Sequence, residues 1–274
     1  MAYKRILTIQ DISCVGQCSM TVAMPILSAC GHETCILPTA LLSTHTGGFG
    51  KPVVTHTSGT MIQMMEHWKA ADISFDAILI GYLGSLEAID GAMQIAGELL
   101  APDGKLIVDP AMADHGKLYS GFDAVYADVM KALCMKADVM IPNITEAAMM
   151  SGTPYQEEYD EAYITGLLDA LGGDQVILTG VGYREGETGI VTRCDGKTYY
   201  YAHPRVGKNY HGTGDMFAAS FTGAWMQEKS IAEAVEIAAG FTLRSIRNTY
   251  ANPAHWYGVK FETALPWLIN KLFG

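Results

Sequence analysis

The segment His211-Gly212-Thr213-Gly214-Asp215 carries the strongest chemical signal in the sequence. Glycines on both sides of Thr213 let the backbone approach a ligand closely. The small, apolar residues that follow predict a helix, whose first N–H groups and positive dipole end would face that ligand and could hold a phosphoryl group. Asp215 then has two interpretations. It is either an ordinary acidic residue in a first helical turn, or a carboxylate placed to accept a proton from an attacking hydroxyl.

Polar residues also stand where short apolar runs end. Asp11, Gly81, Asp109, Asn143 and Thr179 each lie at or just past a predicted strand. In a parallel α/β sheet, ligands bind outside the carboxyl ends of the strands, so we expect the site at this edge. Simpler local roles are also open, since Asn143 could cap the next helix and Asp109, which precedes a proline, could form a turn.

Two common nucleotide-binding motifs are incomplete. Gly50-Lys51 is followed by Pro52, where a P-loop needs Ser or Thr, and position 45 is His. Gly180-Val181-Gly182 is one residue too far from Gly186 for a dinucleotide fingerprint, and it leads into a predicted hairpin. P-loop chemistry and NAD binding are therefore not supported.

The elements that must position these residues alternate along the whole chain. Short apolar runs separated by helices predict one α/β domain, residues 1–274, with a mostly parallel sheet between layers of helices. Predicted strands cover residues 5–9, 33–37, 77–80, 105–108, 138–141 and 175–178, and a hairpin around Asp195-Gly196 joins 189–192 to 197–201. Predicted helices cover residues 20–29, 59–70, 86–100, 124–135, 145–150, 157–171, 214–227, 231–248 and 262–272.

Composition excludes several classes of protein. The 274 residues contain 18 Lys and Arg against 29 Asp and Glu, a net charge of −11, which argues against binding to nucleic acid or to an anionic membrane. Residues 12–50 carry one formal charge, but Pro25 and polar residues interrupt them, so no membrane span is predicted. Asp11 interrupts the apolar N-terminus too early for an export signal. The six cysteines form no C-x-x-C pair, which predicts reduced thiols in a cytoplasmic protein.

Taken together, the motifs resemble the ribokinase superfamily. Gly212-Thr213-Gly214-Asp215 follows a predicted hairpin, and Asn143-Ile144-Thr145-Glu146 lies upstream. Within that superfamily, five segments are similar to pyridoxal kinases: Ile6–Gln10 leading to Gly16, Ser43–Thr46 leading to Gly50, Gly81–Ser85, Asp109–Met112 and Ile141–Asn143. The resemblance runs in order from residue 5 to about residue 250. It implies a three-layer αβα ribokinase-like sandwich and, as in the family, a homodimer.

The resemblance also implies a reaction and its residues. The enzyme would phosphorylate a B6 vitamer (pyridoxal, pyridoxine or pyridoxamine) with ATP and Mg²⁺, in the salvage of pyridoxal 5′-phosphate. Asp215 would deprotonate the 5′-hydroxyl, and Gly212, Thr213 and Gly214 would form the anion hole for the transferring γ-phosphoryl group. The residues implied at ATP are Asn143, Glu146, Thr179 and Asp109, with Glu146 and Asp109 at the metal; those implied at the vitamer are Asp11, Thr46, Tyr82 and Tyr119.

Two residues depart from the pyridoxal kinase pattern. Asp11 stands where Ser is usual, and Ile141 replaces a usual Thr, which puts a monovalent-cation site in doubt. A carboxylate prefers a ring N–H⁺, an ammonium or a sugar hydroxyl, so Asp11 favours a second hypothesis, a kinase for hydroxymethylpyrimidine, a sugar or a nucleoside. The glycine-rich stretch of hydroxymethylpyrimidine kinases is missing after the first strand. A third hypothesis is a catalytically silent ligand-binding protein, against which the retained Asp215 argues. Asp11 could also do no more than cap the turn that follows it.

Overall fold

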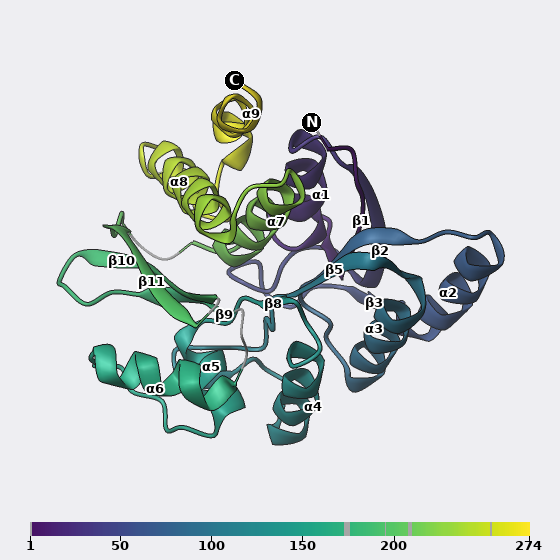
Figure 1. The fold of residues 1–274 in the computed structure, drawn as a ribbon, viewed down its shortest axis with the longest axis horizontal. Coiled ribbons are helices and arrows are strands. Elements are labelled where there is room, and N and C mark those ends of the chain that lie inside the picture. Colours follow the sequence, from purple (N-terminus) through teal and green to yellow (C-terminus); the bar gives the residue numbers. More distant parts are fainter. Residues whose placement is uncertain (1, 173–175, 195, 208–209, 253) are drawn as a thin grey trace. The chain divides into compact units, whose positions relative to one another are not determined.

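A computed structural model describes residues 2–172, 176–194, 196–207, 210–252 and 254–274 (Figure 1). The chain forms two compact units, one of Met1–Leu106 with Val206–Gly274 and one of Ile107–Arg205. The prediction of a single domain stays a prediction. None of the helices in the described ranges has both the length and the apolar character needed to cross a membrane.

Within its described residues, the first unit contains a mostly parallel sheet and six α-helices. Its strands are β1 (Arg5–Ser13), β2 (Glu33–Leu42), β3 (Val54–His56), β4 (Phe75–Ile80) and most of β5 (Leu100–Val108). Its helices are α1 (Met20–Ala29), α2 (Met61–Ala70), α3 (Leu86–Leu99), α7 (Thr213–Met226), α8 (Ile231–Tyr250) and α9 (Leu265–Phe273), with short 3₁₀ turns at Ser58–Thr60 and Phe261–Ala264. Figure 1 shows α1, α7 and α8 in one group and α2 with α3 in another.

The second unit is smaller and carries the antiparallel hairpins. Its strands are β6 (Ala113–Asp114), β7 (Lys117–Leu118), β8 (Val139–Met140), β9 (Val176–Val181), β10 (Glu187–Cys194) and β11 (Lys197–Pro204). Its helices are α4 (Ala124–Cys134), α5 (Ile144–Ser151) and α6 (Glu161–Leu171). Strands β10 and β11 pair antiparallel, as predicted for residues 189–201, while Asp195 of the predicted turn and Gln175 of the preceding predicted strand lie outside the described residues.

In the part of the chain that the structure describes, hydrogen bonds join nine strands in the order β11-β10-β9-β8-β5-β4-β1-β2-β3. The pairs β1–β2, β1–β4, β5–β8 and β8–β9 are parallel, and the pairs at the two edges are antiparallel. Nearly every residue of β1 and β4 is buried, which is typical of strands covered by helices on both faces. The predicted α/β class with a mostly parallel central sheet is confirmed.

Several strands are longer than the apolar runs that predicted them. Strand β1 continues to Ser13, so Asp11 lies within it, at a shift of register between Gln10 and Ile12 against β2. Thr179 likewise lies inside β9, not past its end. Hydrophobic runs mark only the buried part of a strand, whereas hydrogen bonds to a neighbour extend it further.

Side-chain caps set the starts of several helices. The Ser85 and Asp123 side chains accept hydrogen bonds from N–H groups in the first turns of α3 and α4. Asp160 does the same for Tyr163, and for this reason α6 begins at Glu161 and not at the predicted residue 157. Helices α1, α2, α7 and α9 start without a side-chain cap among the described residues, and Gly212 directly precedes α7.

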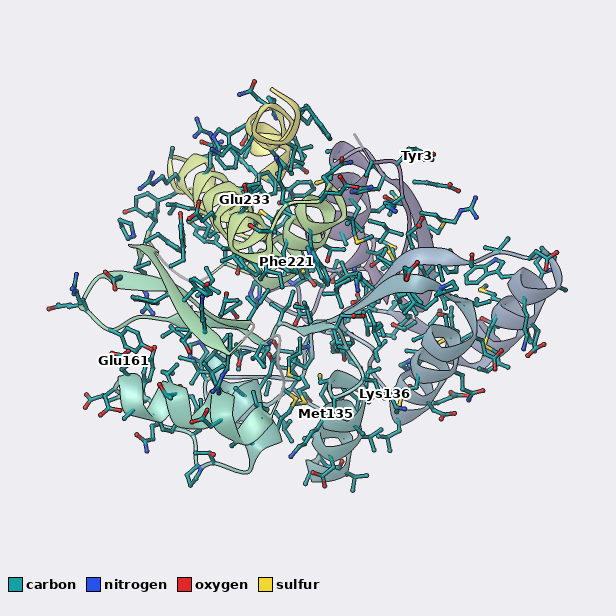
Figure 2. All side chains as sticks on the ribbon, viewed as in Figure 1. Tyr3, Met135, Lys136, Glu161, Phe221 and Glu233 are labelled. Carbon is teal, nitrogen blue, oxygen red and sulfur yellow. The ribbon has the colours of Figure 1, made fainter. Side chains whose placement is uncertain are left out.

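The core of the first unit predicts a stability test. Phe221 of α7 is fully buried and lies 6.4 Å and 5.8 Å, between ring centroids, from Phe217 and Trp225 (Figure 2). We expect Phe221→Ala to lower the free energy of unfolding by about 3–5 kcal/mol, measured by urea denaturation. Tyr3→Ala is the matched control, because Tyr3 is 72% exposed, and a loss for Phe221→Ala no larger than that of the control would contradict this packing.

Candidate functional site

The start of α7 has the backbone of an anion cradle. Gly212 has a φ of +78°, and a Cβ atom there would lie 2.2 Å from the carbonyl oxygen of Gln17, so only glycine fits. The first helical hydrogen bond runs from the N–H of Met216 to the carbonyl of Gly212 (3.0 Å). The N–H groups of Thr213, Gly214 and Asp215 precede this bond, as in any helix start that can bind an anion.

Asp215 lies half-buried beside that cradle. Its Oδ2 accepts a hydrogen bond from the backbone N–H of Ser19 (2.9 Å), 196 positions earlier in the chain. Burial raises the pKa of Asp215 to about 6; the Ser19 hydrogen bond opposes this effect, and the nearby Asp11 carboxylate adds to it. A carboxylate with this pKa is ionised at neutral pH and is a better proton acceptor than an ordinary aspartate.

Asp11 is a second carboxylate, close enough to Asp215 for its charge to raise the Asp215 pKa. It is only 4% exposed, and its Oδ2 accepts a hydrogen bond from the Ser13 hydroxyl (3.0 Å). Burial raises its pKa, while the hydroxyls of Ser19 and Ser13 act in the opposite direction. Ser19 therefore contacts both carboxylates, one through its side chain and one through its backbone. Cys18 lies beside the same pair, since burial and then the charges of Asp215 and Asp11 raise the pKa of its thiol.

Tyr82 and Thr46 are further predicted residues of this unit. Tyr82 follows β4 and is half-buried, and burial together with the Asp11 charge raises its pKa. Thr46 is exposed in the loop after β2, next to His45, whose ring nitrogen Nδ1 accepts the N–H of Gly47 (2.9 Å). The structure thus brings Asp11 near Tyr82 and Asp215, while the loop of Thr46 is held to Val15 by the His45 N–H (3.0 Å).

An aromatic cluster, which the sequence analysis did not predict, holds the Thr46 loop. The His45 ring centroid lies 5.0 Å from those of His211 and Phe49, and Phe49 lies 4.6 Å from Trp256. The backbone of this loop approaches His211 closely, since a Cβ at Gly47 would lie 2.5 Å from the Nε2 of its ring. The run His255-Trp256-Tyr257 is the one sequence signal that could have indicated this cluster.

The remaining predicted residues lie in the second unit, around the start of α5. Asn143 caps α5 and forms a reciprocal capping box with Glu146, so its simple structural role is confirmed. Asp109 accepts the N–H of Ala111 (3.3 Å), which confirms the turn after β5. Asn143 and Thr179 form a parallel bridge, and Thr179 donates its N–H to the carbonyl of Pro142 (2.9 Å). The ends of β8 and β9 are therefore adjacent.

Glu146 is nearly fully buried and makes three backbone contacts. Its Oε1 accepts from the N–H groups of Met112 (3.0 Å) and Ala113 (3.4 Å), and its Oε2 from that of Asn143 (2.9 Å). Burial raises its pKa against the opposing effect of these donors. Asp109 and Glu146 both lie near Cys134, whose thiol pKa is raised by burial and then by the charges of Glu146 and Asp109. Tyr119 is 39% exposed and donates its N–H to Met112 (2.8 Å).

These residues fit Mg²⁺ as an ion held largely through water and phosphate. Asp109 and Glu146 offer hard oxygen donors near Cys134, but Glu146 already accepts three hydrogen bonds. No group of three or more His, Cys, Asp or Glu side chains within the described ranges forms a metal cage. This is the usual situation for Mg²⁺, which keeps several of its waters.

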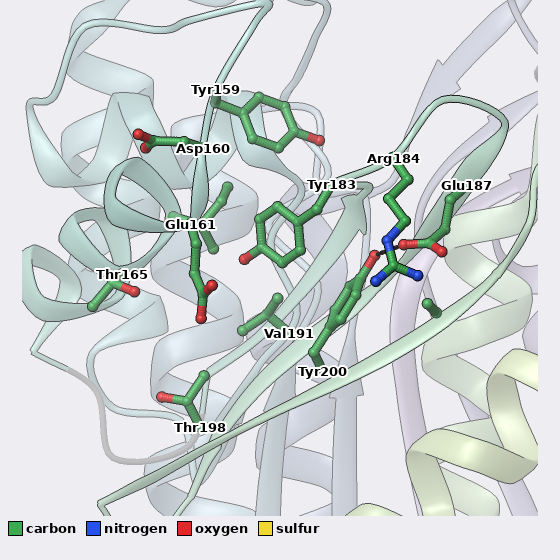
Figure 3. A pocket seen from close by; sticks show the side chains of 12 residues that line it. Tyr159, Asp160, Glu161, Thr165, Tyr183, Arg184, Glu187, Val191, Thr198 and Tyr200 are labelled. Carbon is green, nitrogen blue, oxygen red and sulfur yellow. Dashed lines mark hydrogen bonds between the residues drawn. The ribbon is translucent and has the colours of Figure 1, made fainter.

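A cavity of about 710 Å³ lies elsewhere in the second unit, between the start of α6 and the β10–β11 hairpin (Figure 3). The rings of Tyr183 and Tyr200 form one wall, with centroids 4.8 Å apart, and the Tyr200 hydroxyl donates to Glu187 (2.6 Å). None of the predicted site residues lines this cavity. The predicted site residues therefore form two groups, one at the start of α7 in the first unit and one at the start of α5 in the second.

Comparisons with known proteins identify the family of this chain. The family model described as phosphomethylpyrimidine kinase matches residues 26–259. The pyridoxal kinase of Lactobacillus plantarum is 33% identical, with a TM-score of 0.91 over 97% of both chains. A Bacteroides thetaiotaomicron protein, described as a phosphomethylpyrimidine kinase and solved in a form with pyridoxal, is 32% identical, with a TM-score of 0.90 over 97% of this chain and 95% of the other.

A third relative is named for another acceptor. The hydroxymethylpyrimidine/phosphomethylpyrimidine kinase of Bacillus subtilis is 28% identical over 183 residues, which are 66% of this chain and 66% of that protein. The resemblance to ribokinase-like kinases noted in the sequence is confirmed. Because the family match spans most of its length, the chain belongs to the phosphomethylpyrimidine kinase family of ribokinase-like enzymes, close in sequence and fold to pyridoxal kinases.

Proposed function

We propose that this kinase transfers the γ-phosphoryl group of ATP to the 5′-hydroxyl of a B6 vitamer: pyridoxal, pyridoxine or pyridoxamine. The observation that supports the proposal most strongly is the Asp215 carboxylate, with a pKa of about 6, beside the uncapped N-terminus of α7. Pyridoxal kinase activity in a relative of 33% identity, and pyridoxal in another relative's structure, support the vitamer as acceptor.

Asp215 is proposed as the general base. In the reaction the hydroxyl oxygen forms a bond to the γ-phosphorus, its proton passes to the Asp215 carboxylate, and ADP leaves with the bridging oxygen. The N–H groups of Gly212, Thr213 and Gly214 and the positive end of α7 stabilise the charge on the transferring group. The Ser19 N–H fixes the Asp215 carboxylate, so that little reorganisation is needed when the proton moves.

Asp11, Thr46, Tyr82 and Tyr119 are proposed to contact the vitamer. Asp11 is the one charged member of this set, and its burial makes the carboxylate sensitive to a positive partner. A protonated pyridine nitrogen or the 4′-ammonium of pyridoxamine would provide that partner. The hydroxyls of Ser13 and Ser19 orient the carboxylate for this contact.

Asn143, Glu146, Thr179 and Asp109 are proposed to hold the phosphates of ATP with Mg²⁺. When bound, Mg²⁺ neutralises phosphate charge during transfer. Asp109 and Glu146 would hold its water shell, while the capping box keeps Asn143 in one orientation.

One alternative has specific support. The Bacillus subtilis relative is a hydroxymethylpyrimidine/phosphomethylpyrimidine kinase, and Asp11 replaces the serine usual in pyridoxal kinases. ADP release measured with the three B6 vitamers, hydroxymethylpyrimidine and several sugars would separate the candidates. We expect kcat/KM to be highest with a vitamer. Higher kcat/KM with hydroxymethylpyrimidine or a sugar would replace the proposed acceptor, and no ADP release with any acceptor would favour the silent ligand-binding protein.

A first prediction tests Asp215 as the base. Asparagine keeps an oxygen for the Ser19 N–H but cannot take a proton, so Asp215→Asn should lower kcat by about 10²–10⁴ with nucleotide affinity nearly unchanged. The matched control is Asp128→Asn on the exposed face of α4. Turnover within threefold of wild type would mean that Asp215 is not the base and acts only as a charged residue in the first turn of α7.

The same variant has a stability signature. The folded-state pKa of Asp215 lies above its ordinary value of 3.8, so ionisation costs folding free energy as pH rises from about 4 to about 6, and the cost stays constant above that. Asp215→Asn removes this cost and should therefore leave Tm at pH 7.5 unchanged or raised. A variant that is inactive because it is misfolded would instead show a lower Tm.

A second prediction concerns Asp11. If its charge pairs with the acceptor, Asp11→Ser should shift the pyridoxamine-to-pyridoxal ratio of kcat/KM by roughly tenfold or more, as expected for a charge-assisted contact. Asp11→Asn keeps size and hydrogen bonding but loses the charge, and it should shift the ratio in the same direction. A ratio within twofold of wild type in both variants would mean that the Asp11 charge makes no contact with the acceptor, and that Asp11 only occupies the register shift of β1.

A further inference from the structure

The first turn of α5 holds a short hairpin. Two residues of each strand, β6 and β7, pair with one another, Ala113 with Leu118 and Asp114 with Lys117. Tyr119 closes the loop by donating its N–H to Met112 (2.8 Å). A hairpin of this length is not stable on its own in water. The position of residues 112–119 must therefore depend on contacts made outside it.

Three side chains of the α5 start supply contacts of this kind. Glu146 accepts the N–H groups of Met112 and Ala113, at the base of the hairpin. Asn143 donates its Nδ2 to the carbonyl of Ala113 (2.8 Å). Thr145 reaches the tip, where its Oγ1 accepts the N–H of Gly116 (3.0 Å). We call these bonds from Asn143, Thr145 and Glu146 the α5 latch.

The tip of the hairpin, at Gly116, packs closely against Tyr155. Gly116 has a φ of +74°, and a Cβ atom there would lie 2.7 Å from Cδ1 of Tyr155. Burial raises the pKa of Tyr155, and its contact with the Thr145 side chain acts in the opposite direction. Thr145 itself is 3% exposed. One buried threonine thus connects the tip of the hairpin, the start of α5 and Tyr155.

Two members of the latch are residues that the proposed function assigns to ATP. Asn143 and Glu146 each bond the hairpin base and each other, so their orientations and the position of residues 112–119 are linked. Thr145 is the member with no proposed role at the ligand. It can therefore be changed without removing a group from the site.

We propose that Thr145 is a positioning residue for nucleotide binding: by fixing the tip of the 112–119 hairpin, it keeps Asn143 and Glu146 in the orientation that holds the phosphates. This inference rests on the proposed function for the assignment of Asn143 and Glu146 to ATP. The latch itself rests on the hydrogen bonds of residues 112–119 alone.

Valine has the shape of threonine without the acceptor, so Thr145→Val tests the latch in the full-length protein. We expect amide hydrogen exchange of residues 112–119 to become about fivefold faster or more, which is the loss of one net hydrogen bond. Exchange in β9 and the Tm should stay near wild type. Thr165→Val, on the exposed face of α6, is the matched control, and Thr145→Ser should restore slow exchange.

The functional readout is nucleotide affinity. For Thr145→Val we expect the KM for ATP, and the Kd for ADP measured by calorimetry, to rise about fivefold, with kcat within twofold of wild type. Gly116→Ala disturbs the same contact from the hairpin side and should give the same split. Unchanged exchange in Thr145→Val, or faster exchange with unchanged ADP affinity, would overturn the proposal.

The two proposals can fail separately. A wild-type protein that turns over no acceptor contradicts the proposed function, while the exchange and ADP-binding comparison still decides the role of Thr145. An active enzyme whose Thr145→Val variant binds ADP as tightly as wild type contradicts the latch alone.

Discussion

Two carboxylates, Asp11 and Asp215, lie in one poorly solvated corner, and the candidate site depends on how the fold accommodates them. Burial raises the pKa of both carboxyl groups, and the charge of Asp11 raises that of Asp215 further. Like charges that approach out of water are costly unless hydrogen bonds compensate them. Ser19 supplies this compensation, with its N–H to Asp215 and its hydroxyl to Asp11. Its backbone has a φ of +53°, a conformation rarely adopted outside glycine, which indicates that this contact is held at some cost.

The rest of the first unit is arranged around this corner. A register shift in β1 places Asp11, the glycine at position 212 lets α7 begin against Gln17, and the aromatic cluster fixes the Thr46 loop. In the second unit, the side chains that cap the start of α5 have two roles. They satisfy the helix and also hold residues 112–119. In both units, backbone groups left free at a helix start bind side chains or are available to a phosphate.

Much of this could be predicted from the sequence, for physical reasons that are local. Alternating buried runs and helices indicated the parallel sheet, and Gly-Thr-Gly-Asp before a small-residue helix indicated an anion site. The contacts that tune the chemistry were not predictable in this way. Ser19 meets Asp215 across 196 positions, the shift at Asp11 arises from pairing with β2, and the bonds from Glu146 to Met112 and Ala113 join different elements. Long-range hydrogen bonds of this kind leave no periodic signal in the chain.

The most direct test of the central claim is the pH dependence of kcat/KM, measured with two vitamers. A decrease at low pH that both vitamers share reports an ionisation of the enzyme and not of the substrate. If Asp215 must be ionised to accept the proton, kcat/KM should fall tenfold per pH unit below about 6 with both. In Asp11→Asn the midpoint should move to lower pH, because a neighbouring negative charge is gone. A profile that is flat from pH 5 to 7.5 with both vitamers would contradict the assignment of Asp215 as a base tuned by burial and by Asp11.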